Sequence, residues 1–381
     1  MGLYRLFSRI DFRFVCILLC LMGISLCVIS SFSQASHPLL EEGQGDLFFT
    51  PMVKAQIRGF AIGWVLFFLF ALFDYNKLRE YTWFFYLLSL VLLIGLFLVN
   101  PIQRVHRWYK LPLVSFNMQP SESAKLAVII ALSWFLEKRS QVSQSLVTAF
   151  FAALIVGVPF LLILKQPDLG TALVLFPLSY VMSYFGGLHR YVLRFFHTTS
   201  IVLLCVLFVL FGGVVAPQTM KPFLGKFLKE YQYERLSPET YQQKASLSAI
   251  ALGGISGEGY KQSQYVRGGF LPTPYTDSIF ASYAEEFGFV GVFFLLFIYY
   301  LLIHRCFQVA CVAKDPFGRL LAAGIAAYVA IHVLINIGMM CGFLPITGVP
   351  LLLMSYGGSS IVMTMMALGI LQSIYIRRFM F

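Results

Sequence analysis

The chain has 381 residues, of which 59% are hydrophobic and only 12% charged, and its mean hydropathy is +0.79. Soluble globular proteins are nearer half apolar and a quarter charged, so the composition excludes an ordinary soluble enzyme, a disordered regulator and a nucleic-acid binder. The formal net charge of +11 is instead typical of membrane proteins, which concentrate Lys and Arg on their cytoplasmic side. We therefore expect a single all-α polytopic membrane domain over residues 1–381, with no nucleic-acid partner.

Ten apolar runs of membrane-spanning length follow one another along the chain, because a helix needs about 20 such residues to cross a bilayer. They lie at 13–33, 58–73, 82–99, 122–137, 146–164, 169–186, 195–215, 278–303, 319–344 and 350–374. Ten spans place both termini on one side. With the N-terminus in the cytoplasm, the cytoplasmic pieces carry 14 Lys and Arg, against six in the short outside loops. This bias predicts that both termini are cytoplasmic.

The arrangement leaves a large extracytoplasmic loop, 216–277, between the seventh and eighth helices. Residues 223–231 repeat apolar side chains at helical spacing, which predicts a short amphipathic helix. It would lie either on the membrane surface or on the protein's own outer face. The Gly-rich run 253–259 lacks the Gly-Lys-Ser/Thr ending of a phosphate loop. We expect it to be a flexible or tightly turning part of the loop.

Charged residues at the fourth span are the first candidates for a site. Each ionisable side chain inside a span costs about 2.5–3.5 kcal/mol on insertion scales, so it is retained for function or for pairing. Glu122 and Lys125 are three residues apart, share a helix face and can form an ion pair. Arg107 and Lys110 precede them. The group is either a pair that only stabilises the span or the wall of a polar cavity that holds an anion.

Two further acidic groups lie at the starts of later spans. Asp168 precedes the sixth run and is either a helix cap, favoured by the helix dipole, or part of a site. Thr276 or Asp277 would be the N-cap of the eighth span, and Glu285 and Glu286 lie about 12 Å further along that helix. An Asp followed by two buried Glu predicts a polar cavity that performs acid–base chemistry.

The last two spans carry polar and small residues. We expect His332 and Asn336 to serve packing or hydrogen bonding. The Gly and Ser residues of 355–360 allow close approach between helices.

Six strings, in chain order, resemble the SEDS family of bacterial cell-wall proteins. They are Gln119-Pro120-Ser121-Glu122 with Ala124-Lys125, Gln166-Pro167-Asp168-Leu169-Gly170-Thr171, Thr276-Asp277 with Ile279-Phe280-Ala281 and Glu285-Glu286, Asp315-Pro316-Phe317-Gly318-Arg319, Asn336-Ile337-Gly338-Met339, and Thr347-Gly348-Val349-Pro350 through Ser355-Tyr356-Gly357-Gly358-Ser359-Ser360. The resemblance covers nearly the whole chain. It departs from the family pattern at Tyr275, Ser278 and Glu258.

The resemblance implies a ten-span glycosyltransferase of the bacterial cytoplasmic (inner) membrane that polymerises lipid II into peptidoglycan strands. It implies Asp277 as the essential carboxylate and Glu122 and Lys125 as the lining of a central cavity. It also implies a class B penicillin-binding protein as transpeptidase partner, within a complex of elongation membrane proteins. The absence of long terminal tails favours the elongation and cell-shape branch, with the division paralogue as the alternative.

The chemistry assigns a role to each candidate. Asp277 would act as general base on an acceptor hydroxyl, so that one displacement inverts the donor sugar. Arg107, Lys110 and Lys125 would neutralise the departing diphosphate, and we place Thr276 among the substrate-binding residues. A Mg²⁺ or Mn²⁺ ion is an alternative or an addition, with Asp168 as an outer ligand.

Two other functions remain open. A lipid II flippase or transporter would use intramembrane Glu and Lys equally well, and a non-catalytic scaffold would only dock cell-wall enzymes.

Overall fold

The computed structural model describes residues 9–32, 48–99, 107–110, 117–211 and 240–379. Within them the fold is a bundle of helices with one small antiparallel sheet, in which β1 (Tyr109–Lys110) pairs with β2 (Asn117–Met118). The long helices are α2 (Phe12–Ser31), α3 (Pro51–Leu72), α5 (Thr82–Gly95), α6 (Pro120–Lys138), α7 (Leu146–Lys165), α8 (Leu169–Phe185), α9 (Arg190–Phe211), α14 (Ile279–Val312), α15 (Pro316–Met340) and α16 (Gly358–Ile376). Shorter elements are α4 (Tyr75–Glu80), α12 (Tyr241–Gly253), α13 (Gln264–Arg267) and the 3-10 turns η1 (Leu96–Leu98) and η2 (Ser140–Val142).

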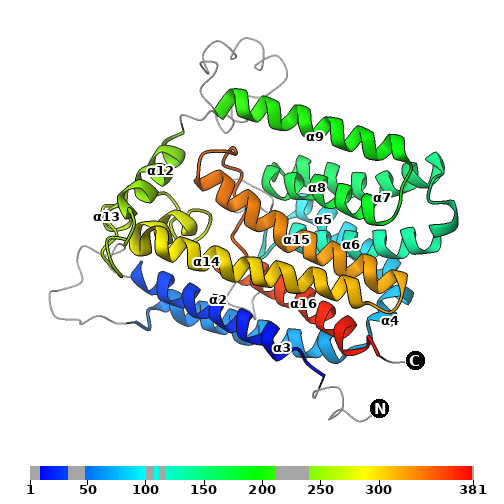
Figure 1. Cartoon of the computed structure of the whole chain (residues 1–381), viewed down its shortest axis with the longest axis horizontal. Coiled ribbons are helices and arrows are strands. Elements are labelled where there is room, and N and C mark those ends of the chain that lie inside the picture. The colour runs from blue at the N-terminus through cyan, green and yellow to red at the C-terminus, as the bar shows by residue number, and fades with distance from the viewer. Residues whose placement is uncertain (1–8, 33–47, 100–106, 111–116, 212–239, 380–381) are drawn as a thin grey trace.

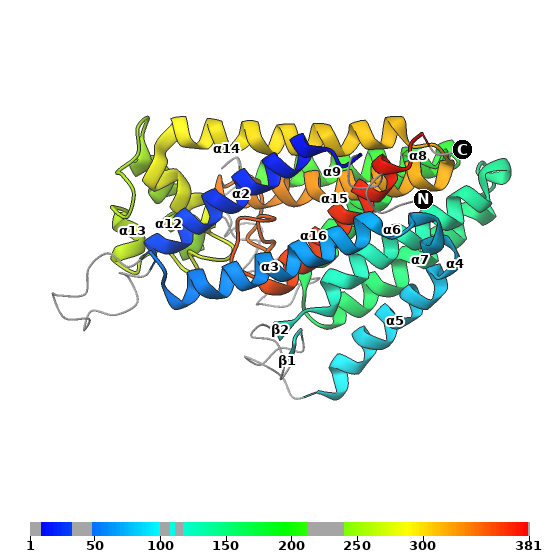
Figure 2. The same ribbon diagram turned by 90° about the horizontal axis from the view of Figure 1, so that it is seen from below.

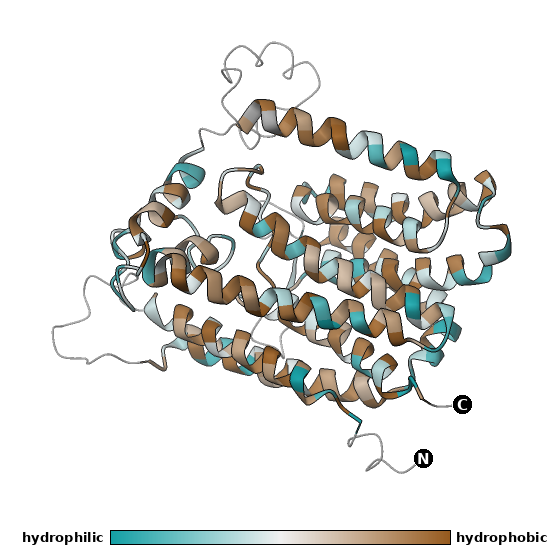
Figure 3. Ribbon diagram, viewed as in Figure 1, coloured by the Kyte–Doolittle hydropathy of each residue, from teal (hydrophilic) through white to brown (hydrophobic). Residues whose placement is uncertain are grey.

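Each predicted apolar run coincides with one of the long helices. Seven of the described helices are long and apolar enough to cross a membrane, and two shorter apolar helices, Thr82–Leu98 and Leu169–Phe185, accompany them. Apolar residues dominate the lengths of the helices in Figure 3. The chain is therefore an all-α, multi-pass membrane protein.

Three boundaries differ most from those predicted. The second helix begins at Pro51 rather than 58, because Thr50 caps it and Pro51 suits the first helical position. The eighth continues to Val312. The last begins only at Gly358, since residues 343–357 contain no helix.

The start of the first helix and the end of the last lie at the same end of the bundle. Ile10, Ala71 and Ile376 form one buried cluster there. The opposite end carries α12 and α13, which are the described parts of the predicted 216–277 loop (Figure 1). The predicted amphipathic helix at 223–231 lies outside the described residues.

Helix α15 is the central element of the bundle. It contacts α14, α8, α6 and α16, and nearly all of its residues are buried. Helix α3 packs along α16, with α2 and α14 beside them (Figure 2). Helix α9 lies at the edge, and its first 18 residues bury nothing. Polar residues on α15 are therefore shielded from lipid, whereas α9 has no such shielding.

Helix α14 is interrupted at Gly288, whose φ of 60° and ψ of −165° are not helical. The break leaves carbonyls of one piece and N–H groups of the next without helical partners. The 253–259 run supplies them. The N–H groups of Glu258 and Gly259 donate to the carbonyls of Glu285 and Glu286, at 2.9 and 3.0 Å. The N–H groups of residues 289 and 290 donate to the carbonyls of residues 254 and 255, at 2.9 and 3.2 Å.

Non-helical backbone at membrane depth is tolerated where protein covers it, and this loop provides the cover. Of the two expectations for the Gly-rich run, flexible or tightly turning, the structure confirms the tight turn. The turn packs against α14. The piece Ile279–Phe287, which directly follows Asp277, is fastened by this loop.

Candidate active site

A buried ion pair lies in the first two turns of α6. The Lys125 Nζ donates to Glu122 Oε1 at 2.8 Å, and the two side chains are only 1% and 3% exposed. The same Nζ lies 2.7 Å from His332 Nε2 on α15. Because His332 Nδ1 donates to the Tyr328 carbonyl at 2.9 Å, Nε2 is the acceptor. The predicted pairing of Glu122 with Lys125 is confirmed, and His332 is a third member.

This cluster keeps one polar atom without a partner. Glu122 Oε2 is buried and accepts no hydrogen bond from the part of the chain that the structure describes. A buried carboxylate oxygen left unsatisfied costs about 1–3 kcal/mol or more. It is therefore an acceptor that a water molecule or a bound hydroxyl would satisfy.

The main chain of Asp277 is held from two sides. Asn336 Nδ2, on α15, donates to the Asp277 carbonyl at 2.9 Å and to the Val349 carbonyl at 2.8 Å. Ser355 Oγ donates to the Thr276 carbonyl at 2.7 Å. The side chain of Asp277 is half-buried. Its carboxylate lies beside Gly348, where an added Cβ would be 3.4 Å from Oδ2.

Ser278 is the N-cap of α14, and it makes no side-chain capping bond. The expectation that Thr276 or Asp277 caps this helix was therefore wrong. The Thr276 hydroxyl instead donates to the carbonyl of Thr273, at 3.4 Å.

The non-helical segment 343–357 passes between the candidate residues. Helices α2 and α3 hold it, because Ser25 Oγ donates to the Met354 carbonyl at 2.8 Å and Gln56 Nε2 to the Ser355 carbonyl at 3.3 Å. On its other side it meets the start of α8, where a Cβ added to Gly170 would be 2.6 Å from the Thr347 carbonyl oxygen. The segment therefore joins the Asp277 region to the Asp168 region.

Asp168 caps α8, as one of its two predicted roles required. Its Oδ1 accepts from the Thr171 N–H at 3.3 Å. Its Oδ2 accepts from the Thr171 hydroxyl, the Gln119 amide and the Ser121 hydroxyl, at 2.9, 2.9 and 3.1 Å. The carboxylate thus ties the start of α8 to the start of α6.

The two upstream cations differ in their surroundings. Arg107 donates from Nε to the Gln166 carbonyl at 3.3 Å, and from a second nitrogen to the Pro167 carbonyl. It therefore fastens the turn between α7 and α8. Lys110 is exposed on β1, where its ammonium is accessible to an anion.

The two glutamates of α14 have opposite surroundings. Glu285 accepts hydrogen bonds from the main-chain N–H groups of Gln264 and Tyr265 at 2.7 and 3.0 Å, and from the Ser263 hydroxyl. It therefore anchors α13. Glu286 is 1% exposed, and neither oxygen has a partner within the described residues. The expectation that both line one acid–base cavity was wrong for Glu285, whose carboxylate has a structural role.

Helix α15 connects the two halves of the site. His332 and Asn336 are four residues apart, which is about 6 Å along the axis. One contacts Lys125 and the other the main chain of Asp277. Sequence reasoning had assigned these two residues to packing or hydrogen bonding. Their spacing of four residues was the available signal that both lie on one face of the helix.

A metal site with three or more protein ligands is not found in the described part of the chain. Asp277 is half-buried, and Asp168 makes four hydrogen bonds. The arrangement can support proton transfer by Asp277, and α15 links its main chain to the buried Glu122–Lys125 ion pair through Asn336 and His332.

Comparison with known proteins identifies relatives of this arrangement. The model of the family described as cell cycle protein, FTSW_RODA_SPOVE, matches residues 12–378. Peptidoglycan glycosyltransferase MrdB of Escherichia coli (strain K12) is 34% identical over 339 residues, or 86% of each chain. Stage V sporulation protein E of Bacillus subtilis is 34% identical over 372 residues, or 96% of each chain.

Solved structures agree with these relatives. A chain of a peptidoglycan synthase complex that coordinates polymerization and crosslinking has a TM-score of 0.76 and 28% identity, covering 98% of this chain and 99% of that one. A mutant of the rod shape determining protein RodA of Thermus thermophilus has a TM-score of 0.69 and 25% identity, with the same coverage.

Proposed function

This chain belongs to the FtsW, RodA and SpoVE family of cell cycle proteins, and we propose that it is a peptidoglycan glycosyltransferase. It polymerises lipid II into glycan strands at the outer face of the bacterial inner membrane, during elongation and maintenance of cell shape. The observation that carries the proposal is the position of Asp277, with its main chain fixed by Asn336 and Thr276 fixed by Ser355. A fixed main chain allows a carboxylate to be aimed at a reacting group.

The reaction that fits this geometry is a direct displacement. The acceptor hydroxyl of one lipid-linked sugar attacks the anomeric carbon of another, a carbon–oxygen bond forms, and the bond to the polyprenyl diphosphate breaks. Asp277 takes the hydroxyl proton as the new bond forms. Displacement from the opposite face inverts the anomeric carbon. The diphosphate leaves with the electron pair of the broken bond, and it departs on its lipid.

The substrate-binding residues follow from charge and position. Lys110 is exposed and suits a direct contact with the diphosphate. Lys125 is buried and paired with Glu122, so it acts by holding that carboxylate in place, and Glu122 offers its unpartnered Oε2 to a hydroxyl or a water molecule. Arg107 fixes the turn beside them. We place Thr276 among the substrate-binding residues because it directly precedes Asp277 in the chain.

We propose that a divalent cation, Mg²⁺ or Mn²⁺, acts at the diphosphate rather than within the bonds that Asp168 makes. Such ions use one or two carboxylates together with phosphate oxygens, and Asp168 would have to release hydrogen bonds from Gln119, Ser121 and Thr171. When bound, the ion would neutralise charge on the leaving diphosphate.

We also infer a crosslinking partner, a class B penicillin-binding transpeptidase, by analogy with the related synthase complex. The elongation role rests on the RodA-like relatives, and a division role like that of FtsW is the alternative. MrdB and the sporulation protein are equally similar to this chain, at 34% each.

The test is polymerisation of lipid II by the purified protein. Asp277→Asn is expected to lower the rate at least 100-fold, because general-base catalysis contributes about 10²–10⁴-fold. The variant keeps the fold, since Asn336 holds the main-chain carbonyl. The matched control is Glu258→Gln, an exposed carboxylate beside the outer loop, which should retain the rate.

Lipid translocation without polymer in the wild type would favour the flippase. Full activity of Asp277→Asn would refute the assignment. If a divalent ion takes part in the reaction, a chelator should lower the polymerisation rate of the wild type, and added Mg²⁺ or Mn²⁺ should restore it.

A further inference from the structure

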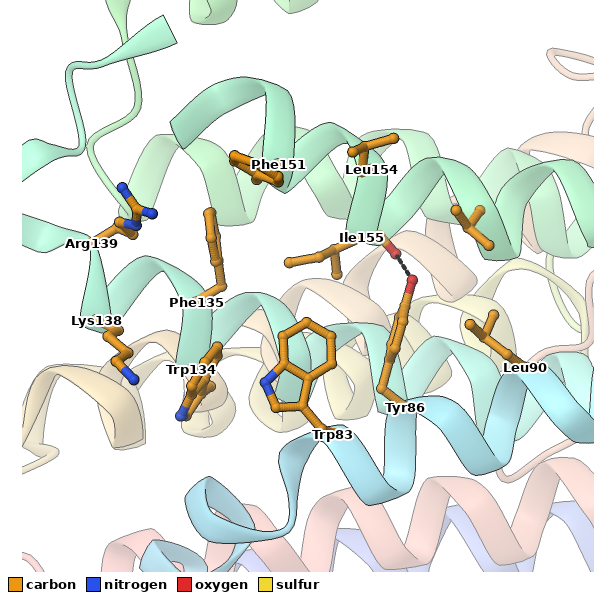
Figure 4. A pocket seen from close by; sticks show the side chains of 11 residues that line it. Trp83, Tyr86, Leu90, Trp134, Phe135, Lys138, Arg139, Phe151, Leu154 and Ile155 are labelled. Carbon is orange, nitrogen blue, oxygen red and sulfur yellow. Dashed lines mark hydrogen bonds between the residues drawn. The ribbon is translucent and has the colours of Figure 1, made fainter. Parts of the chain in front are cut away.

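A cavity of about 720 Å³ lies between α5, α6 and α7, and none of its lining residues belongs to the candidate active site. Pockets for small organic ligands have volumes of about 300–1,000 Å³. Figure 4 shows the lining side chains pointing into the space between the three helices. They are mostly aromatic and aliphatic, and they include Trp83, Tyr86, Phe135 and Leu154. The cavity is therefore large enough and apolar enough for a lipid chain.

The lining is polarised along its length. Lys138 ends α6 and Arg139 follows it as the C-cap. Both lie at one end of the cavity in Figure 4, with Leu90 toward the other end. The Lys138 ammonium lies 4.9 Å from the ring centre of Trp134. No lining residue is acidic, so one end of the cavity is cationic and the remainder is hydrocarbon.

No carboxylate in the described ranges forms a salt bridge with either cation. The acid next to them, Glu137, is engaged by Arg79 at 2.9 Å. Lys138 and Arg139 are both exposed at the bundle end, where they can meet a headgroup.

This end is the one that both termini occupy. Arg79 lies on α4, which follows directly on the end of α3, and the end of α3 belongs to the buried cluster of Ile10 and Ile376. The excess of Lys and Arg in the sequence assigns this end to the cytoplasm.

The side of the cavity is open to the bilayer. Trp83, Phe151 and Leu154 are each 43% exposed, although their side chains belong to membrane-spanning helices. Tryptophan is favoured at the membrane–water interface, and Trp83 and Trp134 lie next to the cationic end in Figure 4. The cavity therefore has an interfacial end and a hydrocarbon end, oriented as a phospholipid is in the cytoplasmic leaflet.

We propose that this cavity binds one anionic phospholipid of the cytoplasmic leaflet. The phosphate is held by Lys138 and Arg139, and an acyl chain lies along Phe135 and Leu154. Basic pockets between helices on the cytoplasmic side are known to take such headgroups. The lipid bridges α5, α6 and α7, where the Tyr86 hydroxyl already joins the Ile155 carbonyl at 2.9 Å. It therefore stabilises the helix whose outer end carries Glu122.

The experiment measures lipid binding to the purified full chain by native mass spectrometry. The probes are palmitoyl-oleoyl phosphatidylglycerol and phosphatidylcholine with the same chains, titrated in a non-ionic detergent. Phosphatidylglycerol is expected to bind at least tenfold more tightly. The double variant Lys138→Gln/Arg139→Gln should bind phosphatidylglycerol roughly tenfold to thirtyfold more weakly, because each Lys or Arg near an anionic lipid surface contributes about 1 kcal/mol.

The matched control is Arg190→Gln/Arg194→Gln, which removes the same charge at the start of α9, outside the cavity. It should change phosphatidylglycerol binding less than twofold. Equal binding of the two lipids, or an equal loss in both double variants, would overturn the proposal. Thermal unfolding of each variant, measured without added lipid, shows whether the fold is retained.

Discussion

The docking of the Gly-rich loop onto the break in α14 can be tested with two alanines. Gly257 has a φ of +81°, and a Cβ there would lie 2.2 Å from the Glu286 carbonyl oxygen and 2.7 Å from the Gly288 nitrogen. Gly269 has a similar φ of +67° but has nothing within 4 Å of its added Cβ. The backbone strain of the left-handed region is common to both, whereas the close approach is found only at Gly257.

The structure sets the expected difference. Left-handed φ costs a non-glycine residue about 1–2 kcal/mol, so Gly269→Ala should lower the free energy of unfolding by about 1 kcal/mol. Gly257→Ala must also move the loop away from backbone atoms, and two buried hydrogen bonds lost at about 1–3 kcal/mol each raise its total to about 3–7 kcal/mol.

Thermal unfolding of both variants in the same detergent measures this difference. The melting temperature of Gly257→Ala should fall well below that of Gly269→Ala. Equal melting temperatures for the two variants would show that the 253–259 loop does not pack against the break at Gly288. The positioning of the residues after Asp277 would then need another explanation.

Two further predictions concern buried charges. Lys125→Met should lower the free energy of unfolding by about 3–5 kcal/mol, because it leaves the Glu122 carboxylate buried without its cation, and the double variant Lys125→Met/Glu122→Gln should regain most of that loss in chemical denaturation. A single variant as stable as the wild type would contradict the buried pair. Glu285→Leu should lower the free energy of unfolding by about 3–9 kcal/mol, since three donors lose their acceptor, whereas Glu286→Leu should change it by less than about 1 kcal/mol. Comparable losses in these neighbours, measured by the same denaturation, would show that Glu286 has bonds of its own.

Local signals in the sequence predicted the helices, the Glu122–Lys125 pair and one of the two roles considered for Asp168. Glu122 and Lys125 are three residues apart on one helix, so helical geometry alone brings them together. Asp168 precedes an apolar run, and a carboxylate at that position satisfies free N–H groups at the helix start. Contacts of this kind depend on neighbours within one turn, which the sequence displays directly.

Contacts between distant segments were not predictable in the same way. Two of the three donors to Glu285 are main-chain N–H groups 20 and 21 residues away, and a main-chain group has no signature in the sequence. The same holds for the carbonyl of Asp277, which Asn336 holds across 59 residues. The late start of α16 is partly explained by Pro345 and Pro350, which disfavour helix. The predicted span nevertheless began at 350, because the residues that follow are apolar.

Two contacts made by α15 set the distance between the Lys125 and Asp277 halves of the site. His332 meets the ammonium of Lys125 and Asn336 meets the residue proposed as the base, so the interval between these anchors equals four helical rises. Helical rise is nearly constant among proteins, while loops differ readily in length and shape. Substitutions in the loops around α12 and α13 can therefore alter those loops and leave this interval unchanged.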